Sequence, residues 1–576
     1  MKPQILLPCL ILSALAPVYS QTAPADPNMP HLERRGAATQ LIVDGKPYLA
    51  LSGELSNTIS SNLEYMKTVW PVLAGKVHLN TVLTGMAWAW IEPEEGKYDF
   101  SIADAAIENA RQNNVHIVWL WFASWKNGMS SFPPPWVKAD QDRFPRAQIT
   151  DGKSVEVLST LSENNREADA RAFAALMRHT REVDTTHRVI MVQLENEVGL
   201  IGDSRDRSPL GNAAFAKPVP AELTDYLQRN KDSLLPEFRR IWEAAGFRTS
   251  GTWEEVFGKG PGKADEIFMG WNYSRYIGRV AEAGKKELPI PMFVNAWIVQ
   301  PTDSVPGDYP SGGPQDHMHD IWRAGGPQID LLCPDIYLPN FVELTARYTR
   351  SGNPLFVPES AGDIRGAANA FYAIGQHRAI GYSSMGIDSM ARLTVEGPDF
   401  FGEATASQPP IEARPLPMAY ATLGQLAPFI LEHQSRGTIA AATVNKQNPL
   451  MQVDLGDYTL SVTLQRDPRS YDVVPDMTGY GIFMLEGPND YLMAGNNIQV
   501  TFTPRTPGPP IAGLAWQESG RFEDGKWVRN RILGGDDSVL RFDNMVTVAA
   551  TYQSGSGVRL SAGERGIQKV KVYRYR

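Results

Sequence analysis

Hydrophobic and polar positions follow two alternating patterns along most of the chain. Short, mainly apolar runs are typical of buried strands, whereas apolar residues three and four apart indicate helices. From residue 38 onward the chain alternates between the two. Eight strands are predicted in this way, over residues 48–53, 81–84, 116–122, 189–194, 292–295, 331–337, 355–357 and 381–386.

Helical patterns separate many of these strands. They cover residues 63–74, 103–110, 168–178, 223–245 and 264–283. Alternation of strand and helix predicts a parallel sheet, and eight repeats of the unit predict a sheet closed into a barrel with helices outside. The predicted fold class is therefore α/β, a (β/α)8 TIM barrel, and we expect this catalytic unit to span residues 38–432.

The pattern changes after a last predicted helix at 418–431. Strand-like runs at 438–444, 458–464, 498–502, 546–551 and 570–573 are separated by Gly, Asp, Asn and Pro. Short strands divided by turn residues are typical of an all-β domain. We expect a β-sandwich-like C-terminal domain over residues 437–576.

The first twenty residues have the pattern of a signal peptide. Lys2 precedes an apolar stretch at 5–18, and small residues follow at a plausible cleavage site. The stretch is too short to span a bilayer comfortably, and no later stretch qualifies. Residues 1–20 are therefore predicted to be a signal peptide and 21–37 a linker. The mature protein is expected to be exported without a membrane span.

Cysteine content and net charge indicate the compartment of the protein and the class of its partners. Cys9 lies in the predicted signal peptide, so only Cys333 remains and no intrachain disulfide can form. An exported protein without disulfides suits a bacterial periplasm. The net charge of −9, from 55 basic and 64 acidic residues, gives no basic surface for nucleic acid. We expect no nucleic-acid partner.

Two predicted strands end in carboxylates. The strand at 189–194 leads into Glu195-Asn196-Glu197, and the strand at 355–357 leads into Glu359. Catalytic residues lie at the carboxyl ends of barrel strands. A retaining glycosidase needs one protonated acid and one ionised nucleophile about 5 to 5.5 Å apart. The alternatives are a solvated strand end for the first segment and a helix N-terminal acid for Glu359.

Tryptophan supports sugar chemistry. Six of the fourteen Trp residues lie between 88 and 136. Aromatic planes stack on the apolar faces of sugar rings. Trp88 and Trp125 fall at or beyond strand ends, so we predict that they bind substrate. Trp119 and Trp121 share one face of a strand, which equally indicates barrel core.

Several segments resemble glycoside hydrolase family 35, the β-galactosidases. They are Leu51-Ser52-Gly53-Glu54, Leu79-Asn80-Thr81-Val82, Trp88-Ala89-Trp90-Ile91-Glu92-Pro93-Glu94-Glu95-Gly96-Lys97-Tyr98-Asp99-Phe100 and Gln193-Leu194-Glu195-Asn196-Glu197-Val198-Gly199. The resemblance implies that Glu197 is the acid/base, that Glu359 is the nucleophile and that Asn196 binds the 2-hydroxyl. It also makes Glu54 and Glu92 candidates for substrate binding.

The chain departs from that family pattern at several positions. Ala89 and Ile91 stand where the family has Asn and His, and Ser124 stands where it has a sugar-binding Glu. Lys126 and Asn127 are the candidate replacements for that carboxylate. The segment from 271–273 to 295–297 is also similar to family 42 β-galactosidases and adds Asn295 as a binding residue. Tyr337, at the end of the sixth strand, is predicted to hydrogen-bond the nucleophile.

The resulting hypothesis is a retaining exo-β-galactosidase. The resemblance and export together suggest terminal galactose on plant-polysaccharide side chains or oligosaccharides, such as xyloglucan-type chains, as the substrate. The alternatives are another retaining β-glycosidase, such as an arabinopyranosidase or β-glucosidase, and a non-catalytic carbohydrate-binding barrel. No cofactor or metal is predicted, because the nine His residues show no ligand spacing. The sequence leaves the oligomeric state open.

Overall fold

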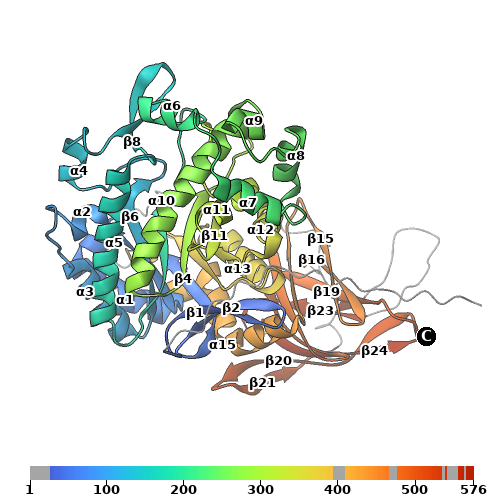
Figure 1. The fold of residues 1–576 in the computed structure, drawn as a ribbon. Coiled ribbons are helices and arrows are strands. Elements are labelled where there is room, and N and C mark those ends of the chain that lie inside the picture. The colour runs from blue at the N-terminus through green and yellow to red at the C-terminus, as the bar shows by residue number, and fades with distance from the viewer. Residues whose placement is uncertain (1–25, 393–408, 466–476, 535–538, 541–555, 564–565) are drawn as a thin grey trace, which may run out of the picture.

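The structure is a computed structural model that describes residues 26–392, 409–465, 477–534, 539–540, 556–563 and 566–576. Eight parallel strands form one sheet, with helices around it (Figure 1). A bridge between Ile336 and Ser360 joins the two ends of the sheet, which closes the barrel. In sheet order the strands are β11 (Leu331–Asp335), β10 (Met292–Trp297), β9 (Val189–Asn196), β6 (His116–Lys126), β5 (Thr81–Ala87), β4 (Ala50–Glu54), β13 (Gly381–Met385) and β12 (Phe356–Val357).

The helices alternate with these strands. The longer ones are α1 (Leu63–Val72), α3 (Ser101–Asn113), α5 (Glu163–Val183), α10 (Glu266–Glu287), α13 (Ile364–Gln376) and α15 (Pro415–Arg436). The shorter ones are α2 (Trp88–Ile91), α4 (Pro135–Ala139), α6 (Pro209–Phe215), α7 (Ala221–Arg229), α8 (Pro236–Ala244), α9 (Trp253–Phe257), α11 (His319–Gly325), α12 (Phe341–Tyr348) and α14 (Asp388–Arg392). The TIM barrel predicted from the sequence is confirmed. Strands β6 and β9 run beyond their predicted ends, to Lys126 and Asn196.

The barrel interior is apolar in its middle and polar at the carboxyl-terminal ends of the strands. Ala50, Phe293 and Cys333 belong to one buried apolar cluster contributed by the strands. Side chains two or four residues further along a strand point to the same face. The three strands therefore direct Glu54, Asn295 and Asp335 into the carboxyl-terminal end of the barrel.

A small antiparallel sheet covers part of the barrel. It consists of β1 (His31–Arg35), β2 (Ala38–Val43) and β3 (Lys46–Tyr48). Leu41 and Val43 belong to the apolar cluster of the barrel strands, so β2 packs on the barrel interior. Residues 31–35 therefore depart from the predicted 21–37 linker, because pairing with β2 gives β1 backbone partners. Nothing within the described ranges is a helix both long and apolar enough to cross a membrane.

The C-terminal part forms two antiparallel sheets, as predicted. One contains β14 (Ile439–Val444), β17 (Gly479–Gly487), β18 (Asp490–Asn496), β24 (Ile567–Tyr575), β20 (Ile511–Glu523) and β21 (Lys526–Ile532). The other contains β15 (Leu450–Leu455), β16 (Tyr458–Leu464), β19 (Ile498–Pro504), β23 (Ser556–Leu560) and β22 (Val539–Leu540). The strand expected at 546–551 lies outside the described residues.

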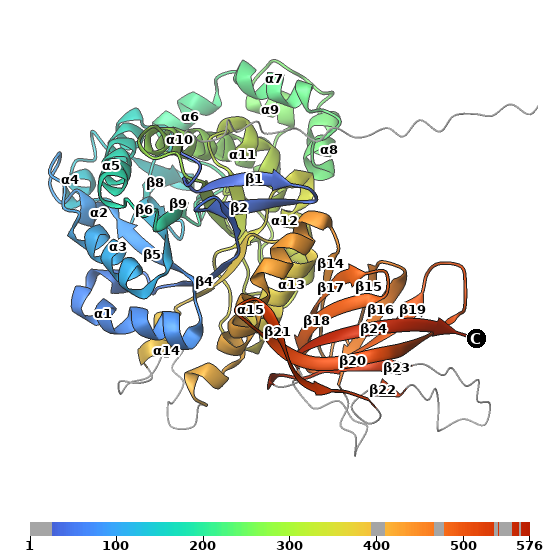
Figure 2. The same ribbon diagram turned by 90° about the horizontal axis from the view of Figure 1, so that it is seen from below.

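The first of these sheets packs directly on the barrel helices α13 and α15 (Figure 2). Tyr480 and Ile482 of β17 belong to the same apolar core as the barrel helices. Helix and sheet approach closely at Gly375 of α13, where a Cβ atom would lie 2.6 Å from the Ala441 side chain. The rings of Phe429 on α15 and Phe522 on β20 lie 4.4 Å apart. Barrel and β domain thus share one core.

Candidate active site

Three carboxyl groups meet at the carboxyl-terminal ends of the barrel strands. Glu197 follows β9, Asp335 ends β11 and Glu359 follows β12. One oxygen from each lies within 4.8 Å of one oxygen from each of the others. None of the three residues is more than 8% exposed, although a lone buried carboxylate is costly. This cluster of buried carboxyl groups identifies the candidate active site, since groups that shift one another's pKa are typical of active sites.

The backbone turns sharply where β9 delivers Glu197. Glu195 and Glu197 both have positive φ values, 59° and 47°, which are uncommon for residues with side chains. The Glu197 amide donates to Asn295 Oδ1 at 3.1 Å, which anchors the turn to β10. Strained backbone of this kind persists only where surrounding structure holds it in place. The Glu197 carboxyl is thereby held beside Glu359.

Burial and the neighbouring Glu359 raise the pKa of the Glu197 carboxyl to about 8. Burial is the larger cause, because removing a carboxylate from water disfavours its charged form. The Lys126 ammonium and a hydrogen bond with Asp335 act in the opposite direction. At neutral pH Glu197 therefore holds a proton that it can donate.

Glu359 has the opposite surroundings. Asn196 Nδ2 donates to its Oε1 at 3.0 Å, and Tyr337 donates its hydroxyl proton to Oε2 at 3.0 Å. Asn295 Nδ2 lies 3.4 Å from Oε1. Donors aimed at a carboxylate favour its ionised form. The Tyr337 contact is the one that the sequence predicted, and Tyr337 is 45% exposed, so this side of Glu359 opens toward solvent.

Lys126 also belongs to this group. Its Nζ donates to Asn196 Oδ1 at 2.9 Å and lies 4.6 Å from the centre of the Phe122 ring. Lys126 is 7% exposed. The neighbouring Asn127 is exposed, with its backbone amide donating to the Asn196 carbonyl oxygen at 3.1 Å. Of the two candidate replacements for the family's carboxylate, only Lys126 contacts the site with its side chain.

Glu54 and Asp335 keep unpartnered oxygens in the site. Neither Glu54 oxygen has a hydrogen-bond partner, although the residue is fully buried, and Asp335 Oδ1 also lacks one. Asp335 Oδ2 accepts from Asn295 Nδ2 at 2.7 Å. Burial, followed by the charge of Glu359, raises the pKa of both carboxyls well above the usual range. Sequence reasoning missed Asp335, although it ends a strand as a carboxylate, the same signal that pointed to Glu359.

Closely spaced carboxylates can also hold a cation, and among the described residues Glu197, Asp335 and Glu359 are the set spaced for one. Hard cations bind deprotonated oxygen ligands. Burial raises the pKa of Glu197 and Asp335, which favours their neutral forms over the deprotonated ligands that a cation needs.

Glu195, the other acid of the β9 motif, has a structural position. Its Oε2 accepts the backbone amides of Trp125 at 2.7 Å and Ala123 at 3.3 Å. Burial, and then the charge of Asp169 on α5, raise the pKa of Glu195 well above its ordinary range. Glu195 therefore fixes the end of β6 from behind the site.

Three predicted binding residues are buried and have hydrogen-bond partners within the protein. Trp88 and Trp125 are fully buried, with indole N–H groups that donate to Glu92 Oε2 and to the Leu158 carbonyl. Glu92 is 3% exposed, and its Oε1 accepts the Gly96 amide. The polar groups of these side chains therefore form hydrogen bonds within the protein. A position near a strand end does not decide whether a side chain faces the barrel mouth or the helices.

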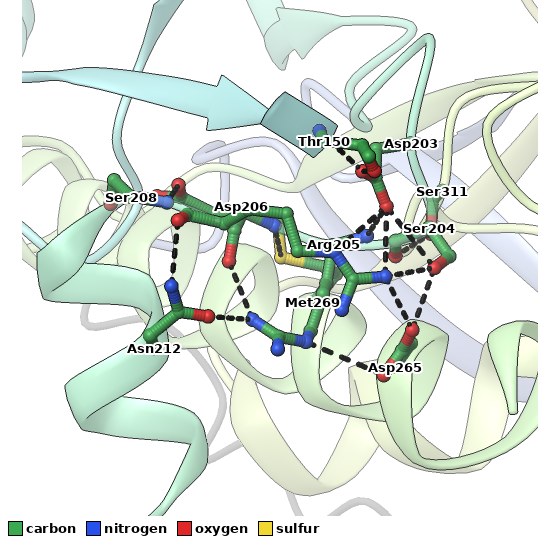
Figure 3. A network of polar contacts seen from close by, with 11 residues as sticks. Thr150, Asp203, Ser204, Arg205, Asp206, Ser208, Asn212, Asp265, Met269 and Ser311 are labelled. Atoms are coloured by element: carbon green, nitrogen blue, oxygen red, sulfur yellow. Dashed lines mark hydrogen bonds and ion pairs between the residues drawn. The ribbon is translucent and has the colours of Figure 1, made fainter. Parts of the chain in front are cut away.

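A polar network holds the segment that follows Glu197 (Figure 3). Asp203 accepts from the Thr150 amide at 2.8 Å and from Arg207 Nη2 at 2.9 Å. Arg207 Nη2 also donates to Asp265 at 2.8 Å, beside the start of α10. Ser311 Oγ donates to the Ser204 carbonyl at 2.6 Å. These contacts connect the segment after Glu197 to the hairpin of β7 (Arg146–Ile149) and β8 (Lys153–Leu158), to α10 and to the loop after β10.

Comparisons with known proteins give two family-model matches. Residues 72–257 match the family model described as "Beta-galactosidase", that of glycoside hydrolase family 42. Residues 416–542 match a model described as a domain of unknown function (DUF5597). No curated protein matches the chain.

Similar solved structures include a catalytic domain and two β-galactosidases. The catalytic domain of a β-amylase from Paenibacillus polymyxa shares 14% identity at a TM-score of 0.41, over 59% of this chain and 92% of that one. β-Galactosidases from Bacillus circulans sp. alkalophilus and Rahnella sp. R3 share 13% and 15%, at TM-scores of 0.45 and 0.43, over 67% and 66% of this chain. The chain spans 57% of the length of each β-galactosidase. Scores of this size carry no argument about function.

The barrel and the family match define a glycoside hydrolase-like protein. The matching family model is that of family 42, over about a third of the chain, and family 35, which the sequence resembles, is not shown.

Proposed function

We propose that the protein is a retaining exo-β-galactosidase whose acid/base is Glu197 and whose nucleophile is Glu359. The observation that carries the proposal is the pairing of these two carboxyls. Their oxygens approach within 4.8 Å, whereas inverting enzymes separate theirs by about 6.5 to 9.5 Å to admit water. Their surroundings also differ, since Glu197 is raised in pKa and Glu359 accepts three donor contacts. Unequal environments are what assign the acid and the nucleophile in such pairs.

The reaction proceeds by two displacements. Glu359 attacks the anomeric carbon while protonated Glu197 gives its proton to the leaving glycosidic oxygen, which forms a covalent glycosyl-enzyme. Glu197, now a carboxylate, takes a proton from water, and the water oxygen displaces Glu359 with overall retention. Asn196 Nδ2 donates to Glu359, and the resemblance to family 35 supports a role for Asn196 in binding the 2-hydroxyl of the sugar.

Substrate contacts are proposed for the polar residues that the structure brings to the site. These are Glu54, Lys126, Asn196, Asn295 and Tyr337. The family match supports a β-galactoside substrate, and the signal-like N-terminus supports export to a bacterial periplasm. Terminal galactose of plant-polysaccharide side chains or oligosaccharides is the proposed target.

The test is hydrolysis of a panel of aryl β-glycosides by the purified protein, with NMR detection of the first anomer formed. Faster cleavage of the β-galactoside than of the β-glucoside and α-arabinopyranoside, with β-galactose released first, is the expected result. Preference for another sugar would overturn the galactose assignment, and the α-anomer would overturn retention. A protein that hydrolyses nothing on the panel but binds galactosides would instead be a carbohydrate-binding barrel.

A further inference from the structure

Among the described residues, the polar layer at the barrel mouth places one cation among several acids. Glu54, Glu197, Asp335 and Glu359 lie within reach of one another, and Lys126 from β6 enters the same layer. Lys126 is 7% exposed, and its ammonium contacts the Phe122 ring and the Asn196 oxygen. An ammonium that is buried to this extent needs a compensating negative charge nearby.

We propose that Lys126 is the counter-cation of the nucleophile, which it serves by holding Asn196 and by balancing the single negative charge of the resting site. The inference rests on the proposed function and adds a positioning residue to it. Lysine can only donate hydrogen bonds, so the Asn196 oxygen faces Lys126 and the Asn196 amide group faces Glu359. One amide side chain thus connects the ammonium to the carboxylate.

The charges in the layer then balance. Burial raises the pKa of Glu54 from β4, Glu197 from β9 and Asp335 from β11, which favours the neutral form of each. Glu359 carries the negative charge, and Lys126 carries the positive one. Among the described residues Tyr337 also faces Glu359. Partial burial, followed by the charge of Glu359, raises the pKa of Tyr337, so it holds its proton. Without Lys126 the layer would hold an uncompensated anion.

The cation acts on the acid as well as on the nucleophile. Lys126 lowers the pKa of Glu54, Glu197 and Asp335 alike. Replacing it with an apolar residue of similar length removes this effect, so Glu197 would hold its proton to higher pH. The alkaline limb of the pH profile of kcat/KM, which Glu197 sets, therefore moves upward in Lys126→Met. An opposite charge within a few ångströms moves a carboxyl pKa by about 1 to 3 units, so a movement of about one pH unit is expected.

The experiment compares the full-length parent, Lys126→Met and Lys126→Arg on an aryl β-galactoside between pH 4 and about 10, a range that spans both limbs of a glycosidase profile. Lys126→Met is expected to move the alkaline limb, which Glu197 sets, upward by about one pH unit. Lys126→Arg keeps the charge and is expected to restore the limb. An alkaline limb that stays in place in a folded Lys126→Met protein would overturn the inference, since loss of packing alone lowers activity at every pH.

Two controls separate the possible failures. A parent without activity on the aryl panel refutes the proposed function, whereas an active parent with an unmoved variant refutes only the role of Lys126. If Lys126→Met does not fold, as judged by its thermal midpoint, Lys126→Gln supplies the neutral variant. Gln can still donate to the Asn196 oxygen, so an alkaline limb that stays in place in Lys126→Gln would reject the charge balance.

Discussion

The ionisation of Glu197 predicts how kcat/KM falls on the alkaline side of its pH profile. Its pKa of about 8 against an ordinary 4.5 corresponds to about 5 kcal/mol for ionising the carboxyl in its pocket. A group with this pKa is about 90% protonated at pH 7 and about 10% protonated at pH 9. We therefore expect kcat/KM for a substrate with a poor leaving group to fall about tenfold between these pH values.

The assay measures glycosylation with two aryl galactosides whose leaving groups differ in pKa. In Glu197→Gln the side chain cannot ionise, so the alkaline limb is expected to disappear. The activated substrate is expected to lose much less activity than the poor one, because its leaving group needs little protonation. Glu94→Gln, at an exposed carboxylate outside the site, is the matched control and should keep the parent profile.

If Glu197→Gln retains the limb near pH 8, another group titrates there and Glu197 does not set the limb. If the variant loses the same factor on both substrates, Glu197 is not the proton donor, since a proton donor matters most for the poorer leaving group.

Three further predictions follow from the same geometry. Glu359→Ala is expected to abolish turnover, and azide should restore part of it with α-galactosyl azide as product; near-normal activity without azide would remove Glu359 from the mechanism. Glu54 keeps its proton in the folded state after the unfolded chain has lost it, so stability falls as pH rises above about 4.5. Glu54→Gln should make that fall shallower by up to about 1.4 kcal/mol per pH unit in denaturant titrations at pH 5 to 7; an unchanged slope would contradict it. Burial opposes ionisation of Asp203, but hydrogen bonds from Arg207 and Thr150 prevail and lower its pKa to about 2. Asp203→Asn should therefore reduce the thermal midpoint and kcat/KM at pH 7, with the difference in midpoint shrinking as pH falls toward 2; an undiminished difference at low pH would exclude the ion pair as its cause.

The barrel was predictable because each strand–helix unit has its own local pattern. The positions of Glu197 and Glu359 were predictable for the same reason, since each follows an apolar run. The orientation of Trp125 was not, because irregular pairing at the end of β6 determines which face its side chain takes. The contact between Lys126 and Asn196 depends on the register of β6 against β9, which neither segment encodes alone.

Sequence reasoning also treated residues 31–35 as part of a linker. Their strand exists through pairing with β2, and a short polar segment such as this has no apolar periodicity of its own. Asp335 shows a different limit. A single acid at a strand end is common, and only the meeting of β11 with β9 and β12 distinguishes this one.

The shared core between α13, α15 and β17 bears on how the protein can change over evolution. A module joined by a linker can be exchanged or lost without harm to its neighbour. Here Tyr480 and Ile482 fill the surface that the barrel helices present, and removal of the β sheets would leave that apolar surface in water. We therefore expect a barrel deprived of its β domain to be unstable or prone to association. In the described parts of the chain, the β domain makes no hydrogen bond with Glu197 or Glu359. Substitutions in β17 would therefore affect the site only indirectly, through the barrel helices that β17 packs against.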